Sequence, residues 1–141
     1  MAMSKITAEF QSNIEEVWSV VTSLDNYTWR SDLGKIEVLK EGKQFVEYTK
    51  DGYQTTFTIT AFQPFERYEF DMENENMTGH WTGKFSFKNG RTIIEFTEDV
   101  TVKKVFMRPF AKLYLKKQQE RYIVDLRKAL GMKDFEKHTD Y

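Results

Sequence analysis

The residue whose setting best suits it for chemistry is Glu98, which interrupts the apolar face of a predicted strand. Residues 92–102 alternate between two faces, and Glu98 falls on the face that is otherwise apolar or small. If Asn89-Gly90 forms a two-residue hairpin turn, Glu98 lies directly opposite Trp81 on the preceding strand. A carboxylate beside a tryptophan on an inner face breaks the pattern, and such breaks mark functional or strained positions.

Two interpretations of Glu98 follow from its position. In the structural one, Glu98 pairs with an Arg or Lys of a long C-terminal helix or reaches solvent at the sheet end, because buried acids are generally paired. In the functional one, it faces a cavity, where burial raises its pKa and makes it a ligand anchor or a general acid/base. Glu98 is therefore the candidate catalytic residue.

Other kinds of chemistry have little support. The chain has no Cys, which excludes disulfides, thiol catalysis and thiolate metal sites. His80 falls on the polar face of its strand, and His138 lies in a polar C-terminal stretch. Because the two histidines are not clustered with other ligands, we expect no metal site, and no motif predicts a cofactor.

Aromatic residues make up 16% of the chain, with 12 Phe, 7 Tyr and 3 Trp. Strand alternation places many of these rings on one face, and a two-residue turn at Asp51-Gly52 adds Tyr48 to it, opposite Thr55. The rings either fill a core completely or line a pocket. For the pocket, we expect a wall with Glu98 as its polar anchor and these aromatic residues: Trp29, Tyr48, Tyr68, Phe70, Trp81, Phe85 and Phe96.

The elements that position these residues follow from periodicity. An opening strand ends near Phe10, and the capping-box spacing of Ser12 to Glu15 predicts a helix that stops near Thr22. Residues 34–102 carry the hairpin and strand signals of a six-stranded meander. Helical periodicity then runs from Val105 to Leu130.

This order predicts an α+β fold, in which an antiparallel sheet of about seven strands packs against a long C-terminal helix. No Pro- or Gly-rich linker divides the chain. We therefore expect a single domain over residues 1–141, with an ordered core over 4–131 and a polar tail over 132–141.

Charge is distributed unevenly along the chain. Its net charge is −1, yet within residues 103–128 Lys and Arg outnumber Asp and Glu by nine to two. Arg108, Lys112 and Lys116 recur at helical spacing and form a basic stripe. We interpret the stripe as a solvated face that complements an acidic sheet; contact with an anionic membrane is the alternative that we do not favour. Nucleic acid is not expected, since no aromatic residues alternate with the stripe as a stacking platform.

The sequence bears on the cellular location of the protein only through the signals that it lacks. The sequence has no apolar run long enough for a transmembrane helix and no signal-peptide pattern. Together with the lack of Cys, this leads us to expect a cytoplasmic protein. The sequence leaves the oligomeric state open.

Several short motifs occur in a characteristic order. After the opening strand come Ser12–Trp18, then Leu24-Asp25, Tyr27 and Trp29, the Gly90–Thr92 turn and the long helix. In this order the sequence resembles the START-like superfamily, also called SRPBCC, with its polyketide cyclase/dehydrase and lipid-transport members. The resemblance covers Ser4 to Leu130. It departs at Asn13, where many members have Pro, although Asn also caps helices well.

The resemblance implies a helix-grip fold, in which the curved sheet wraps around the C-terminal helix and leaves a cavity. Members bind hydrophobic or aromatic small molecules there, and some catalyse cyclisation or dehydration, without a universal catalytic motif. Our leading hypothesis is a carrier or sensor of such a molecule. The alternatives are a cyclase/dehydratase-type enzyme that uses Glu98 as general acid/base, and a protein- or membrane-surface module that uses the basic helix.

Overall fold

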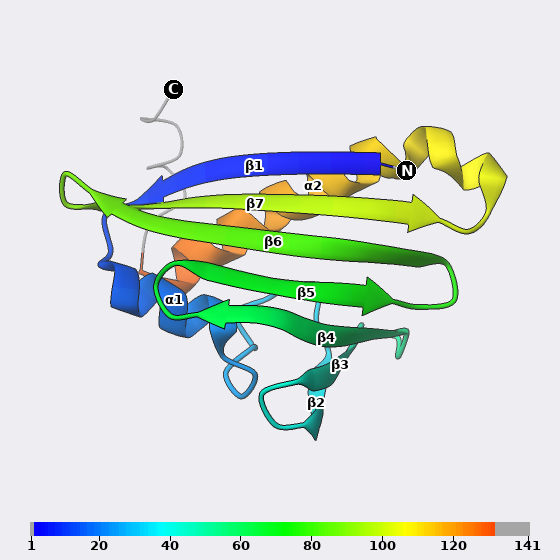
Figure 1. Cartoon of the computed structure of the whole chain (residues 1–141), viewed down its shortest axis with the longest axis horizontal. Coiled ribbons are helices and arrows are strands. Elements are labelled where there is room, and N and C mark those ends of the chain that lie inside the picture. Colours follow the sequence, from blue (N-terminus) through cyan, green and yellow to red (C-terminus); the bar gives the residue numbers. More distant parts are fainter. Residues whose placement is uncertain (1, 132–141) are drawn as a thin grey trace.

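The computed structural model describes residues 2–131, and the polar tail predicted over 132–141 lies outside them. Within residues 2–131, seven strands form one antiparallel sheet in the order β1-β7-β6-β5-β4-β3-β2 (Figure 1). The predicted α+β helix-grip fold is confirmed. The strands are β1 (Ala2–Phe10), β2 (Lys35–Lys40), β3 (Gln44–Tyr48), β4 (Gln54–Gln63), β5 (Arg67–Glu73), β6 (Met77–Lys88) and β7 (Arg91–Val102). The helices are α1 (Ile14–Thr22), the short 3₁₀ helix η1 (Val105–Met107) and α2 (Arg108–Ala129).

Helix α1 begins one residue later than the capping box predicts. The Asn13 side chain, not that of Ser12, caps the helix by accepting a hydrogen bond from the Glu16 amide at 2.8 Å. Ser12 contributes its carbonyl, which accepts a hydrogen bond from the Thr92 hydroxyl at 2.7 Å and so ties the helix start to β7. The predicted end of the helix at Thr22 is confirmed.

The β6–β7 hairpin has the predicted register. Asn89 and Gly90 both have positive φ, at 54° and 75°, so Lys88 pairs directly with Arg91 across a two-residue turn. Counting back along the ladder places Trp81 opposite Glu98. The position of the carboxylate on the inner face therefore follows from the turn.

The β3–β4 hairpin differs from its prediction by one residue. Its loop has three residues, because the Thr49 amide donates to the Tyr53 carbonyl at 2.9 Å and Gly52 takes a φ of 90°. Tyr48 consequently pairs with Gln54 rather than with Thr55. A shift of one residue reverses the faces of a strand, so the prediction that Tyr48 faces inward is wrong.

Helix α2 packs mainly against β1 and β7, at one edge of the sheet (Figure 1). Gln119 is buried at this contact, where its side-chain oxygen accepts from the Ser4 hydroxyl at 2.8 Å and its amide donates to the Ser4 carbonyl at 3.0 Å. The Arg127 guanidinium also donates to the Glu9 carbonyl at 3.1 Å. Within residues 2–131 no helix is long and apolar enough to cross a membrane.

Gly83 makes room for a ring on the inner face of β6. A Cβ at Gly83 would lie 2.5 Å from the Trp81 indole and 3.3 Å from the Phe96 ring. With only hydrogen there, the indole lies over the strand and stacks on Phe70, with ring centres 4.8 Å apart and planes within 4°. Gly83 therefore sets the orientation of Trp81.

We expect Gly83→Ala to lower the free energy of unfolding by about 1–3 kcal/mol, because the added methyl group must displace the indole from a packed site. Urea unfolding followed by far-UV circular dichroism measures the change, and near-UV circular dichroism reports the altered Trp81 environment. Ser86→Ala, at an exposed position on the same strand, is the control. An unchanged near-UV spectrum and unchanged stability would contradict this role of Gly83.

Candidate functional site

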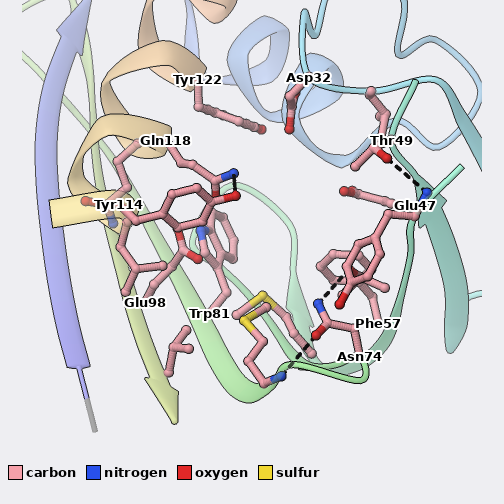
Figure 2. Close-up of a pocket in the computed structure, with 18 of the residues that line it drawn as sticks. Asp32, Glu47, Thr49, Phe57, Asn74, Trp81, Glu98, Tyr114, Gln118 and Tyr122 are labelled. Atoms are coloured by element: carbon pink, nitrogen blue, oxygen red, sulfur yellow. Dashed lines mark hydrogen bonds between the residues drawn. The ribbon is translucent and has the colours of Figure 1, made fainter. Parts of the chain in front are cut away.

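A cavity of about 650 Å³ lies between the inner face of the sheet, helix α2 and the loop that joins α1 to β2. Figure 2 shows Glu98 and Trp81 on one side of it, Glu47 on the opposite side, and Tyr122 and Asp32 along its upper edge. This volume falls in the range of roughly 300–1,000 Å³ typical of small-molecule sites. The aromatic residues therefore do not fill the interior completely.

The structure brings most, but not all, of the predicted site residues to this cavity. Its lining includes five of them: Trp29, Tyr68, Phe70, Trp81 and Glu98. Phe85 and Phe96 are buried behind the wall, where Phe96 contacts Trp81 at 4.7 Å between ring centres. Tyr48 lies on the outer face, where its hydroxyl donates to Glu37 at 3.2 Å.

Glu98 faces the cavity without a protein partner. Among residues 2–131 its carboxyl forms no hydrogen bond and no salt bridge, so the pairing with a basic residue of the long helix, which one of the two interpretations of Glu98 included, does not occur. Burial raises the pKa of Glu98 to about 7, opposed by the positive charge of Arg30 and reinforced by the negative charge of Glu47. Near neutral pH the carboxyl can therefore hold or release a proton.

Arg30 lies on the cavity wall with its charge compensated. Its two terminal nitrogens contact the two carboxylate oxygens of Glu47 at 2.8 and 3.2 Å, and one of them also contacts Asp32 at 3.0 Å. Burial by itself would lower the pKa of Arg30, but Glu47 and Asp32 together raise it. The bidentate pair fixes the guanidinium plane and, with Asp32, compensates the charge of Arg30.

Two tyrosine hydroxyls also belong to the polar part of the wall. Within residues 2–131 neither the Tyr68 nor the Tyr122 hydroxyl forms a hydrogen bond, and the Tyr68 side chain belongs to a residue only 3% exposed. Burial, followed by the charge of Glu47, raises the pKa of Tyr68. Burial also raises the pKa of Tyr122, against the influence of Arg30. Both hydroxyls stay protonated and can donate to a bound molecule.

The loop between α1 and β2 is held in place by α2. The buried carboxylate of Asp125 accepts hydrogen bonds from the backbone amide and the hydroxyl of Ser31, both at 2.8 Å. Trp29, on the same loop, donates from its indole nitrogen to the Asn26 carbonyl at 3.1 Å and packs edge-on against Tyr122. These contacts place Arg30 and Trp29 on the wall of the cavity.

Sequence reasoning missed Arg30, Glu47 and Tyr122. Tyr122 could have been found, because Leu115, Gln119, Tyr122 and Leu126 follow helical spacing on the side of α2 that faces the sheet. The position of Glu47 follows from the three-residue loop, because the register that this loop sets places Glu47 on the inner face, the same face as Phe45. Arg30 sits in an irregular loop, where no periodicity indicates its direction.

His80 lies on the outer face of the sheet, as the strand alternation predicts. Its ring nitrogens lie 2.7 Å from Glu69 and 2.7 Å from Asp71 on the neighbouring strand. The hydrogen bond to Asp71 raises the pKa of His80, with partial burial opposing the change. His138 lies outside the described residues. Within residues 2–131 no group of three or more His, Cys, Asp or Glu side chains could hold a metal ion.

The sequence over residues 1–131 matches the family model described as polyketide cyclase / dehydrase and lipid transport. The chain belongs to this family. No protein of curated function matches the sequence. The match covers the sheet, both α-helices and every residue of the cavity wall.

Solved structures show the same fold at low sequence identity. An uncharacterized protein from Bacillus thuringiensis is 15% identical with a TM-score of 0.78, covering 91% of this chain and 98% of its own. A START superfamily protein from Mycobacterium smegmatis is 19% identical with a TM-score of 0.66, covering 91% and 93%. The Aha1 dimer from Colwellia psychrerythraea is 14% identical with a TM-score of 0.72, covering 92% and 96%.

The raised pKa of Glu98 predicts a specific pH dependence of stability. Because the folded-state pKa of about 7 exceeds the ordinary 4.5, the folded state binds the proton more tightly. The stabilisation is fully present below about pH 4.5 and is lost as the pH rises through about 7. Relative to Glu98→Gln, the wild type should lose about 2–3 kcal/mol between about pH 5 and about pH 8.

Urea unfolding of both proteins across this pH range measures the difference. Glu73→Gln, at an exposed position on β5, provides the control and should show no comparable divergence. Parallel stability curves for the wild type and Glu98→Gln would show that Glu98 titrates normally.

Proposed function

We propose that the protein binds a hydrophobic small molecule in the cavity, as a carrier or sensor, and recognises one polar group on it. The observation that carries this proposal is the combination of open volume and unused polar groups. The cavity is lined largely by apolar and aromatic side chains, while the Glu98 carboxyl and the hydroxyls of Tyr68 and Tyr122 have no partner within residues 2–131. Buried polar groups are normally hydrogen-bonded, so a ligand that supplies the missing partners would stabilise the fold.

The charges around the cavity favour a particular kind of polar group. Arg30 is already neutralised by Glu47 and Asp32, and the other cations on the lining, Lys104 and Arg121, are exposed residues. A carboxylate on the ligand would therefore meet Glu98 and Glu47 without a free deep cation. A neutral or protonated hydrogen-bond donor, such as a hydroxyl or an amine, suits the Glu98 carboxyl better.

We expect N-phenylnaphthylamine, an apolar fluorescent probe with one N–H donor, to bind more tightly than its charged relative anilinonaphthalene sulfonate. Glu98→Leu removes the acceptor and should weaken binding of the neutral probe by about 1 kcal/mol, or roughly fivefold. Probe fluorescence measures the dissociation constants directly. Native mass spectrometry of the purified full chain reports any ligand that co-purifies.

A matched pair of tyrosine variants gives the control. Tyr68→Phe removes a hydroxyl on the cavity wall, whereas Tyr48→Phe removes one on the outer face. Because a tyrosine hydroxyl oxygen can also accept from the N–H of the probe, we expect Tyr68→Phe to weaken probe binding and Tyr48→Phe to leave it unchanged. Failure of both probes to bind, together with a ligand-free mass spectrum, would overturn the proposal.

The cyclase/dehydratase alternative has one specific observation in its favour. Glu98 is an unpartnered carboxyl beside a cavity, with a pKa near neutral pH, which is the condition for a general acid/base. The Tyr68 and Tyr122 hydroxyls could stabilise negative charge that develops on a substrate oxygen. Under this alternative, Glu98 transfers the proton and the tyrosines position the substrate.

For a substrate that the protein cyclises or dehydrates, Glu98→Gln should lower kcat/KM by about a hundredfold or more. The wild-type rate should also change with a pKa near 7, and the variant rate should not. The pH–rate profile of both proteins is the measurement. A Glu98→Gln variant that retains the wild-type rate and pH–rate profile would exclude Glu98 as the general acid/base. That result would not contradict the proposal that the cavity binds a ligand.

A further inference from the structure

The segment at the start of the C-terminal helix exposes a series of large apolar side chains. We call it the lip, and it comprises Val105, Phe106, Met107, Phe110, Leu113 and Tyr114. Phe106 is 70% exposed and Phe110 is 65% exposed. In the same stretch Ala111 and Leu115 are buried, so the start of the helix carries both buried apolar side chains and the exposed apolar surface of the lip. Contiguous exposed apolar surface of this kind marks an interaction site.

The lip is surrounded by positive charge. Residues 103–117 contain Lys103, Lys104, Arg108, Lys112, Lys116 and Lys117, with no Asp or Glu among them. None of these six forms a salt bridge within residues 2–131. Lys103 and Arg108 donate instead to the backbone carbonyls of Asn74 and Val102. Their charges are therefore not neutralised by the protein itself.

The lip also borders the mouth of the cavity. Phe106, Met107, Phe110 and Tyr114 belong to both the lip and the cavity lining. In Figure 1, η1 and the first turns of α2 extend past the end of the sheet. The molecule therefore presents its apolar side chains, its uncompensated cations and the cavity opening together.

We propose that the lip docks the protein on the surface of a bilayer that contains anionic phospholipids. Phe106 and Phe110 enter the interface between headgroups and acyl chains, and Lys104 and Lys112 contact the phosphates. Interfacial helices combine aromatic and aliphatic side chains with Lys and Arg in this way. Docking in this orientation would turn the cavity mouth toward the hydrocarbon phase, from which a hydrophobic ligand could enter.

Charge complementarity selects the membrane over a second copy of the chain. In a symmetric dimer each lip would face an identical lip, which would bring two unneutralised basic segments together. An anionic lipid surface supplies the missing countercharge and also accepts the apolar side chains. This revises the interpretation of the basic stripe as only a solvated face.

Co-sedimentation of the full-length protein with vesicles tests the proposal. We expect binding to equimolar phosphatidylcholine and phosphatidylglycerol to be at least about tenfold tighter than to phosphatidylcholine alone. Raising the ionic strength should weaken it, because the Debye length falls from about 10 Å at 0.1 M salt to about 3 Å at 1 M. No cavity ligand is added, so the result does not depend on the proposed function.

Two sets of variants separate the apolar and electrostatic contributions. The double variant Phe106→Ser, Phe110→Ser should lose vesicle binding, and Lys104→Gln with Lys112→Gln should lose most of its preference for anionic vesicles. The control is Phe87→Ser with Lys88→Gln, which removes an exposed Phe and a Lys at the β6–β7 hairpin. It should bind vesicles like the wild type, and far-UV circular dichroism confirms that each variant is folded.

The proposal is overturned if the wild type does not bind anionic vesicles, or if the control variant loses binding as strongly as the lip variant. Analytical ultracentrifugation provides a further decisive outcome. Wild-type self-association that is abolished by Phe106→Ser, Phe110→Ser, in the absence of vesicle binding, would assign the lip to a dimer interface instead.

Discussion

The attachment of α2 to one edge of the sheet is the constraint on which the rest of the molecule depends. Gln119 accepts a hydrogen bond from the Ser4 hydroxyl and donates one to the Ser4 carbonyl. These bonds hold the helix over β1 and β7. A helix about 10 Å wide cannot also cover the inner faces of β3 to β5. The loop that Asp125 holds through Ser31 covers part of the remainder, and the space left between them is the cavity.

The same cavity places two acidic side chains in opposite circumstances. Glu47 is fixed by both oxygens on the Arg30 guanidinium, whereas Glu98 stands among rings with no partner of its own within residues 2–131. An unpaired carboxyl in such surroundings costs free energy in its charged form, and its pKa near 7 reflects that cost. Environment, and not residue type, therefore separates a structural acid from one available to a ligand.

The sequence was most informative where a local rule determines geometry. The Asn89-Gly90 turn sets the register that brings Trp81 opposite Glu98, and strand alternation places Tyr68 and Phe70 on the cavity wall. Tyr48 was misplaced because Asp51-Gly52 suits two- and three-residue loops alike, and one extra residue exchanges the two faces. Family resemblance and strand alternation together were enough for the overall fold.

Other parts of the site depend on contacts between distant segments, which no local pattern encodes. Arg30 is directed into the cavity by Glu47, seventeen positions along the chain, and by a loop that is tied to α2. The lip was not predicted from the sequence, because helical spacing alone does not say which side of α2 the side chains of Phe106 and Phe110 occupy. Only the position of α2 over the edge of the sheet leaves them in solvent.

The pairing of β1 with β7 has a consequence for how the chain folds. Ala2 lies beside Val100 in the finished sheet, so the first strand has no neighbouring strand until β7, the last one, has been synthesised. Contacts of such long sequence separation make folding slow, on the millisecond-to-second scale typical of β-rich topologies. The hairpins from β2 to β7 can assemble as they leave the ribosome, while β1 waits with an open edge. Closing the sheet therefore requires the two ends of the chain to meet, since β1 pairs with β7 and α2 packs on β1.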